Sequence, residues 1–338
     1  MQQQSEKEYT AKDIQVLEGL EAVRIRPGMY IGSTDQRGLH HLVYEVLDNA
    51  VDEAMAGFCD LVEISIDAQG QVTVVDNGRG IPVDIHPATG KTALETVMTT
   101  LHAGGKFGGG AYKVTGGLHG VGGSVVNGLS EYLRAEVRRG GWVYFQEYAE
   151  GQPLGKLVKG EKTECHGTVI SFRPDPKIFP VIEYDFETLV NHFKEIAFLN
   201  KGLEIRFTSR WHEEQRNGDA ERNYYFDGGI ATLVRNVNRN RKVMQQLPFY
   251  YEKTLDNTLV EVAVQYNDSF TETVLSFANC INTQEGGSHL TGFRSALTRV
   301  INDYARRQSF IKEDQANLTG EDVREGLAAV ISVKLTDP

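Results

Sequence analysis

Apolar residues recur at three- and four-residue intervals between Leu39 and Ala56, a spacing that predicts a helix with one apolar face. We expect that face to pack against a hydrophobic core. Acids and one amide share the other face, within an arc of about 140° at about 100° per residue. They are Glu45, Asp48, Asn49, Asp52 and Glu53. No lysine or arginine lies four residues away to offset their repulsion. The stripe is therefore either a solvated surface or a site that faces something cationic.

Shorter patterns predict the other elements. Alternation of apolar and polar residues predicts strands at 61–66, 71–75, 133–138, 142–148, 168–172 and 203–208. Helical spacing predicts helices at 13–24, at 92–101, from about residue 124 and at 184–199. Farther along, 259–266 and 273–280 alternate like antiparallel strands, followed by a helix at 293–307 and a strand at 328–335. This strand–helix–strand order predicts a crossover unit.

The chain has 338 residues, which is enough for about two domains. The polar run at 210–219 is the best signal for a boundary or an excursion, and we place the border near residue 225. We expect an N-terminal arm at 1–12, a first domain at 13–224 and a second domain at 225–338.

Composition narrows the class of protein. The hydrophobic content of 40% suits a globular core, and no run of about 18 apolar residues predicts a membrane span. The polar N-terminus does not resemble a secretory signal. Cys59, Cys165 and Cys280 are scattered, which predicts neither a zinc site nor a disulfide framework and fits the reducing cytoplasm. The net charge of -11 argues against a general nucleic-acid coat protein but allows a local DNA-facing surface.

Two glycine-rich motifs are candidates for ligand binding. At 76–80 (DNGRG), a predicted strand ends in a carboxylate and two glycines, which let the backbone turn closely against a flat ligand. Asp76 could accept a hydrogen bond from an amino group such as that of adenine, although an ordinary Asn-Gly turn has the same sequence. At 115–126 (TGGLHGVGGSVV), a glycine loop enters a predicted helix start, where free N–H groups can bind an anion. A mobile surface loop is the alternative, and we expect His119 to be packed rather than catalytic.

Two common phosphate-binding motifs are absent. The stretch at 88–92 (ATGKT) ends like a P-loop, but Ile85 stands where its first glycine should be. No G-x-G-x-x-G follows a strand and opens a helix. If both glycine motifs meet the acidic helix at one nucleotide, Asn49 could bind Mg²⁺ and Glu45, one turn away, could activate a water.

Four motifs resemble the ATP-site motifs of the superfamily that unites gyrase, Hsp90, histidine kinases and MutL. They are Glu45-x-x-x-Asn49, Asp76-x-Gly78-x-Gly80, 117–122 (GLHGVG) and Gly167-Thr168. Within that superfamily, 26–32 (RPGMYIG), 101–107 (LHAGGKF) and 284–289 (QEGGSH) resemble the ATPase subunits of bacterial type IIA topoisomerases. The similarity covers almost the whole chain. It is greatest to the gyrase type and second to the topoisomerase IV type.

The resemblance implies an α+β fold, with a two-layer α/β sandwich ATPase domain (the Bergerat fold) followed by a transducer domain like ribosomal protein S5. It implies a cytoplasmic ATP-driven clamp that self-associates on ATP binding, passes double-stranded DNA and introduces negative supercoils together with the gyrase A protein. Residues 102–123 would form a lid over the triphosphate. Topoisomerase IV decatenation is the alternative, and an Hsp90- or MutL-like clamp is a more distant one. A histidine-kinase module fits poorly because Glu45 is present and more than a hundred residues follow the ATP-site motifs.

The resemblance also implies roles for individual residues. Glu45 would be the general base and Asn49 the Mg²⁺ ligand, while Asp76 would accept from the adenine amino group with support from Thr168 through water. Gly80, Ile81 and Pro82 would line the base pocket, Lys106 and Tyr112 would reach the phosphates or ribose, and Tyr9 would reach the nucleotide of a second copy. The backbone of the glycine loop would hold the triphosphate through Gly117, Leu118, His119, Gly120, Val121 and Gly122. Asp76, Arg79, Arg139 and Thr168 match positions that bind aminocoumarin antibiotics.

Three features depart from the family pattern. Gly123 and Gly128 stand where small apolar residues are expected, and glycine inside a helix costs roughly 0.5–1 kcal/mol against alanine, which predicts a looser lid hinge. The chain ends at Pro338, before the expected position of a transducer lysine that touches the γ-phosphate, so we expect a fragment with weak turnover.

A basic stretch at 235–242, joined by Arg306 and Arg307, is either a local DNA contact or a solvated face.

Overall fold

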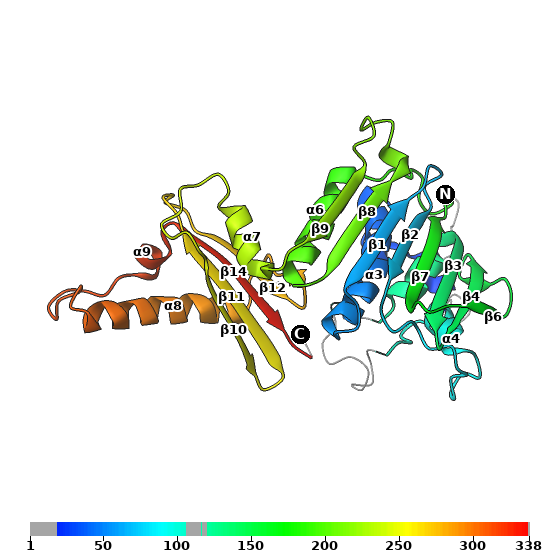
Figure 1. Cartoon of the computed structure of the whole chain (residues 1–338), viewed down its shortest axis with the longest axis horizontal. Coiled ribbons are helices and arrows are strands. Elements are labelled where there is room, and N and C mark those ends of the chain that lie inside the picture. The colour runs from blue at the N-terminus through cyan, green and yellow to red at the C-terminus, as the bar shows by residue number, and fades with distance from the viewer. Residues whose placement is uncertain (1–18, 106–115, 117–119, 337–338) are drawn as a thin grey trace, which may run out of the picture.

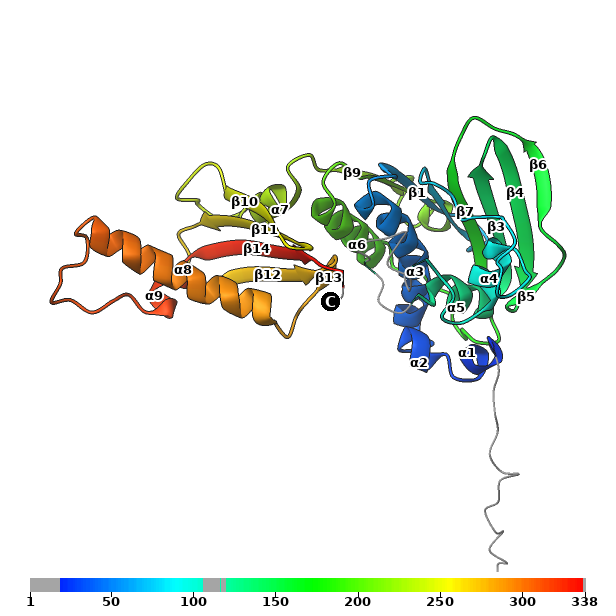
Figure 2. The same cartoon turned by 90° about the horizontal axis from the view of Figure 1, so that it is seen from below.

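Two β-sheets organise the structure, a computed structural model whose described residues are 19–105, 116 and 120–336 (Figures 1 and 2). Within these residues, one sheet has nine strands and the other has five. The two sheets lie toward opposite ends of the long axis of the molecule (Figure 1).

The larger sheet places the two predicted ligand-binding strand ends side by side. Its strands are β1 (Leu61–Ile66), β2 (Val72–Asp76), β3 (Ser130–Arg139), β4 (Trp142–Ala149), β5 (Gln152–Pro153), β6 (Val158–Lys162), β7 (Gly167–Pro174), β8 (Glu204–Ser209) and β9 (Glu221–Tyr225). Their order is β5-β4-β3-β7-β2-β1-β8-β9, and β6 pairs with β4. Because β2 and β7 are antiparallel neighbours, the end of β2 at Asp76 meets the start of β7 at Gly167.

Helices cover one face of this sheet (Figure 2). The helices of the first domain are α1 (Glu21–Ile25), α2 (Gly28–Ile31), α3 (Gln36–Met55), α4 (Ala93–Thr99), α5 (Gly122–Gly128) and α6 (Phe186–Leu199). The long amphipathic helix predicted from Leu39 is α3, which begins three residues earlier because Asp35 caps it. The Asp35 carboxylate accepts a hydrogen bond from the backbone N–H of Arg37 at 2.9 Å.

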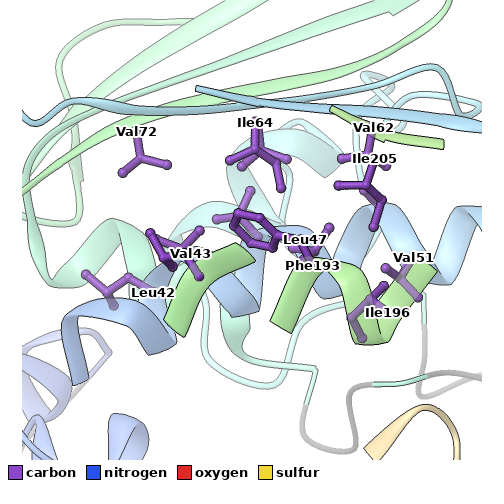
Figure 3. Close-up of a cluster of buried hydrophobic side chains, with 14 of the residues drawn as sticks. Leu42, Val43, Leu47, Val51, Val62, Ile64, Val72, Phe193, Ile196 and Ile205 are labelled. Atoms are coloured by element: carbon purple, nitrogen blue, oxygen red, sulfur yellow. The ribbon is translucent and has the colours of Figure 1, made fainter. Parts of the chain in front are cut away.

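The apolar face of α3 packs against the sheet, beside α6, which covers the same face (Figure 3). Each of these side chains is at most 2% exposed, and burying one contributes about 1.5–3 kcal/mol. The labelled members are Leu42, Val43, Leu47, Val51, Val62, Ile64, Val72, Phe193, Ile196 and Ile205. The predicted core face of α3 is thereby confirmed, and this packing fixes which way the polar stripe points.

The smaller sheet belongs to the second half of the chain. Its elements are α7 (Gly229–Val237), β10 (Phe249–Leu255), β11 (Thr258–Tyr266), β12 (Thr273–Ala278), β13 (Ile281–Asn282), α8 (Ser288–Arg307), α9 (Gly320–Arg324) and β14 (Leu327–Lys334). The strand order is β10-β11-β14-β12-β13. The predicted crossover is confirmed, since β12 and β14 are parallel neighbours joined through α8. The strands predicted at 259–266 and 273–280 do not pair, because β14 lies between them.

The polar run at 210–219 is an excursion inside the first sheet. It forms the short helix η2 (Arg210–His212) and a turn between β8 and β9, which pair antiparallel. The first sheet ends with β9 at Tyr225, and α7 then begins at Gly229. Among the described residues, every helix is too short or too polar to cross a bilayer.

Candidate functional site

A cavity of about 690 Å³ opens between α3, the ends of β2 and β7, and the segments that lead into α4 and α5. Small-molecule sites usually have volumes of about 300–1,000 Å³. The predicted site residues that line the cavity are Asn49, Asp76, Arg79, Gly80, Ile81, Pro82, Gly120, Gly122, Arg139 and Thr168. Residues from five separate parts of the sequence therefore face one space.

Asp76 is the carboxylate at the end of β2. Its Oδ1 accepts hydrogen bonds from the backbone N–H groups of Gly78 at 2.8 Å and Thr168 at 3.2 Å. Burial raises the pKa of Asp76 to about 6, although both N–H groups favour the ionised form. The carboxylate is thus held in a fixed orientation and can accept a further hydrogen bond when ionised.

Glycine is required where β7 starts. Gly167 has a φ of 127°, and a Cβ there would overlap the carbonyl oxygen of Asp76. Gly80 has a φ of 73°, and a Cβ there would lie 3.0 Å from the carbonyl oxygen of Gly167. These glycines let the two strand ends approach closely enough to form one wall of the cavity.

Arg79 and Glu53 form the most complete ion pair of the site. The Arg79 guanidinium donates from Nε at 3.0 Å and from Nη2 at 2.8 Å to the two oxygens of Glu53, whose carboxylate also accepts from the Arg79 backbone at 2.9 Å. The guanidinium carbon lies 4.0 Å from the ring centroid of Phe58. Glu53 is 8% exposed. One acid of the polar stripe therefore holds an arginine.

Arg139 closes the same wall from β3. Its Nη1 donates to the carbonyl oxygens of Arg79 at 3.1 Å and Gly80 at 2.8 Å. His166 contacts the carbonyl oxygen of Gly78 through Nδ1 at 2.8 Å. The turn after β2 is thus fixed from three directions.

Glu45 lies at the other end of the cavity, beside its lining. Its Oε1 is 3.0 Å from Nε2 of His41, one helical turn earlier. This hydrogen bond raises the pKa of His41. A Cβ on Gly122 would overlap the Glu45 carboxylate, so glycine is needed for that group to sit against the start of α5.

The start of α5 faces the cavity next to Glu45. Val121 is its N-cap and makes no side-chain capping bond to the helix. The N-terminus of a helix offers free N–H groups and a partial positive charge to an anion. On α3, Asp52 accepts a hydrogen bond from the backbone N–H of Gly116 at 2.7 Å, which ties this part of the glycine loop to the polar stripe.

Comparisons with known proteins agree with this geometry. Residues 34–178 match the family described as "Histidine kinase-, DNA gyrase B-, and HSP90-like ATPase", and 229–338 match the family described as "DNA gyrase B". The chain is 55% identical over 333 residues to the DNA gyrase B protein of Halalkalibacterium halodurans, a match that covers 98% of this chain and 51% of that protein.

The similarity extends to the three-dimensional structures of solved proteins. The 43K ATPase domain of Thermus thermophilus gyrase B, solved in complex with an aminocoumarin, is 38% identical with a TM-score of 0.83, over 94% of this chain and 81% of that one. This chain belongs to the DNA gyrase B family. The topoisomerase IV ATP-binding domain of Francisella tularensis, in complex with a small-molecule inhibitor, is also similar, at 31% identity and a TM-score of 0.77 over 96% of this chain and 84% of that one. The higher identities favour the gyrase type.

Membership in the gyrase B family confirms the predicted fold class and identifies the first domain as nucleotide-binding. The chain spans about half the length of the curated relatives it matches, at 51% of the Halalkalibacterium halodurans protein.

Several predicted residues of this gyrase B family member lie outside the described residues. They are Tyr9, Lys106, Tyr112, Gly117, Leu118 and His119. The described residues therefore include the cavity wall formed by the ends of β2 and β7 and the start of α5, but not these six.

The basic stretch at 235–242 is partly structural. Asn238 is 3% exposed and donates to Gln265 at 2.9 Å, while Arg241 donates to Thr273 at 3.0 Å. Arg306 is exposed, but it donates to Asn317 and to backbone oxygens of the loop after α8. The other exposed arginines of this stretch and its extension, Arg235, Arg239 and Arg307, are the candidates for a DNA contact.

Sequence reasoning missed His41, His166 and the specific partner of Arg79. His41 could have been found, because it precedes Glu45 by one helical turn on the same face. The pairing of Glu53 with Arg79 joins residues 26 positions apart and depends on how α3 packs on the sheet. His166 reaches Gly78 only because β2 and β7 are neighbours.

Proposed function

We propose that this chain is the ATP-binding and hydrolysing gate of a bacterial DNA gyrase, which drives DNA strand passage and negative supercoiling. The observation that carries the proposal is the single cavity that joins Asp76, Asn49 and the start of α5, with Glu45 beside Gly122. One end offers a hydrogen-bond acceptor for a base, and the other offers groups suited to phosphates and to an attacking water.

The base of ATP would bind against the wall made by β2 and β7. Asp76 would accept from the exocyclic amino group of adenine, with Thr168 supporting it through a water. Gly80, Ile81 and Pro82, which line the cavity, would contact the ring. Guanine has a carbonyl at the corresponding position, so the ionised carboxylate would repel it.

The triphosphate would extend toward α5. Gly120 and Gly122 line that end of the cavity, and the N-cap residue of α5, Val121, makes no side-chain hydrogen bond to the helix. The backbone of Gly117 to Gly122 would cradle the phosphates, and Lys106 and Tyr112 would reach them or the ribose.

The residues present fit a magnesium ion that is held mainly by the nucleotide. Among the described residues, no three His, Cys, Asp or Glu side chains gather as metal ligands. Mg²⁺ typically uses one or two protein oxygens together with phosphates and waters. Asn49 would supply the protein oxygen, and the ion would neutralise phosphate charge as the γ-phosphate leaves.

Glu45 would act as the general base. Its carboxylate lies against the start of α5, where the terminal phosphate would be, and could take a proton from the attacking water. His41 donates to the other side of that carboxylate and holds its orientation.

The partners follow from the same proposal. The gyrase A protein and double-stranded DNA would bind mainly outside this chain, with Arg235, Arg239 and Arg307 as a local DNA contact. ATP would promote self-association through the arm at 1–12, with Tyr9 reaching the nucleotide of the second copy. Aminocoumarins would contact Asp76, Arg79, Arg139 and Thr168, and the protein would work in the cytoplasm.

Replacing the general base tests the proposal. Glu45→Ala should bind an ATP analogue with an unchanged Kd and lose about 10²- to 10⁴-fold in kcat, because only proton transfer is removed. Glu63→Ala is the matched control, since Glu63 is an exposed acid on β1 whose ion pair with Arg206 lies outside the cavity lining. Retained turnover in Glu45→Ala, measured in the full-length protein, would contradict the role of Glu45.

The gyrase assignment needs the complete enzyme. The full-length protein is expected to supercoil relaxed plasmid in the presence of ATP and the gyrase A protein. Relaxation and decatenation without supercoiling would instead support the topoisomerase IV type, which one of the similar structures represents.

A further inference from the structure

The turn between β12 and β13 has an unusual backbone. Asn279 and Cys280 are its two central residues, with φ values of 47° and 69°, and the flanking pairs are antiparallel. A two-residue turn with both φ values positive favours asparagine first and glycine second. A cysteine at the second position is strained, and strained residues of this kind concentrate at functional sites.

Asn279 fixes the segment that leaves β14. It is fully buried, and its side chain accepts from the backbone N–H of Leu335 and donates to the carbonyl oxygen of Leu335, both at 2.8 Å. Its own backbone N–H donates to Val333 at 2.9 Å. Three hydrogen bonds therefore hold the turn to the end of β14.

Cys280 packs the turn against the first domain. Its Sγ lies 3.8 Å from Sδ of Met55, the last residue of α3, and it accepts from Nδ2 of Asn200 at 3.4 Å, just after α6. Cys280 is 7% exposed and belongs to the same buried cluster as the core of the first domain. A residue of the second domain thus touches the ends of both long helices of the first.

Gly116 joins the same junction. Its backbone N–H donates to Asp52 at 2.7 Å, and a Cβ on it would lie 3.4 Å from the carbonyl oxygen of Asn279 and 3.6 Å from Cε of Met55. Asp52 follows Asn49 by three residues on α3 and follows Glu45 by seven. The junction lies two helical turns from the proposed general base.

We infer that the Asn279–Cys280 turn is a positioning element that couples the nucleotide site to the orientation of the second domain. This inference rests on the proposed function. Because α3 carries Glu45 and Asn49 and ends at Met55, a shift of the turn changes the support of that helix. Because Asn279 also forms hydrogen bonds with Leu335, a change at α3 on nucleotide binding would alter the position of the segment at the end of β14.

Replacing Cys280 can remove its contacts with the first domain without disturbing the backbone of the turn. Cys280→Gly suits the backbone of the turn, so it should preserve the local fold while it removes the contacts with Met55 and Asn200. Cys280→Ser keeps a small polar group that can bond to Asn200. Asn267→Ala is the control, because Asn267 is equally buried but bonds to Asn238 and Ser269 within the second domain.

The experiment measures hydrogen exchange of β12 and β14 with and without a non-hydrolysable ATP analogue, together with kcat and KM for ATP, in the full-length protein. We expect the analogue to slow exchange in both strands of the wild type. Cys280→Gly should reduce that slowing by about fivefold and lower kcat by about fivefold at unchanged KM, which is the low end of typical coupling. Cys280→Ser, which keeps the bond to Asn200 but not the sulfur contact with Met55, should restore each value in part, and Asn267→Ala should keep the nucleotide effect.

Two results would overturn the inference in different ways. If the wild type binds the analogue but Cys280→Gly keeps its full effect on exchange and kcat, the turn does not couple the domains and the proposed function stands. If the wild type does not bind the analogue, both the inference and the proposed function fail.

Discussion

The two ends of the cavity are built differently. At the end proposed to bind the base, called the base end below, Asp76, Arg79 and Arg139 are held by hydrogen bonds within the protein, including three from Arg79 to Glu53. At the end proposed to bind the phosphates, called the phosphate end below, the N-cap residue Val121 makes no side-chain hydrogen bond to α5, and Glu45 is held by His41, a residue of its own helix. The first end is complete before a ligand arrives, whereas the second offers groups that a ligand can complete.

Because of this difference, substitutions at the base end should affect folding stability, whereas substitution of Glu45 should affect turnover. Removing Glu53 at the base end breaks three hydrogen bonds to a carboxylate whose side chain is 10% exposed, so the fold should lose stability along with affinity. Removing Glu45 breaks only a local pair on α3, whose side chains are 27% and 40% exposed, and should leave stability nearly unchanged while turnover is lost. Variants at the two ends should therefore fall into two classes.

The largest expected effect on stability is at the base end. Glu53→Ala should lower the free energy of unfolding by about 2 kcal/mol, because it removes a nearly buried carboxylate that accepts three hydrogen bonds from Arg79, while the Arg79 side chain that it leaves is 31% exposed. Urea unfolding of the chain measures this loss. Glu63→Ala is the matched control, because the Glu63–Arg206 pair has side chains 51% and 47% exposed and should contribute less than about 1 kcal/mol. Equal losses in the two variants would remove the contrast between the ends.

The second effect is a pH dependence of nucleotide binding at the base end. Burial raises the pKa of Asp76 to about 6, and the ionised carboxylate is a stronger acceptor for an amino group than the protonated acid. The Kd for an ATP analogue should therefore rise, by at most about tenfold per unit, as the pH falls below about 6. Titration calorimetry between pH 5 and 8 tests this, and Asp76→Asn should bind more weakly with a flat profile.

The same raised pKa has a defined effect on stability. The folded protein binds the proton of Asp76 more tightly than the unfolded chain does, so protonated Asp76 favours the fold at low pH. That contribution is complete below the unfolded pKa of about 4 and is lost as the pH rises through about 6. For nucleotide binding, in contrast, a wild-type Kd for the ATP analogue that does not change between pH 5 and 7 would contradict the proposed role of Asp76 as the acceptor for the adenine amino group.

The sequence predicted the elements that are buried on one face. The period of α3 was clear because one side packs on the core and the other does not. β10 was missed because all seven of its residues are exposed, so no alternation marks it. Pairing was the other limit, since the strands at 259–266, 273–280 and 328–335 were all predicted, but not that the third of them, β14, lies between the other two.

The candidate site shows the same limit. Motifs such as Asp76-x-Gly78-x-Gly80 are local and could be recognised, because the backbone geometry that needs them is local too. Which acid of the polar stripe would pair with Arg79 could not be predicted, because Glu53 reaches it only through the packing of α3 on the sheet. The contact of Cys280 with Met55 spans 225 positions and has no sequence signal.

The smallest expected effects come from two glycines of α5, and they test whether the phosphate end depends on mobility. A Cβ on Gly123 would lie 3.6 Å from Sδ of Met98, and one on Gly128 would lie 3.5 Å from Cβ of Leu20, so alanine fits at both positions. Each substitution should raise the free energy of unfolding by about 0.5–1 kcal/mol. Gly123 lines the cavity and Gly128 does not. If the uncapped start of α5 must move to complete the site, Gly123→Ala should alter kcat while Gly128→Ala stabilises the fold with unchanged kinetics. Identical kinetics in both variants, measured beside their unfolding curves, would show that the phosphate end is as preorganised as the base end.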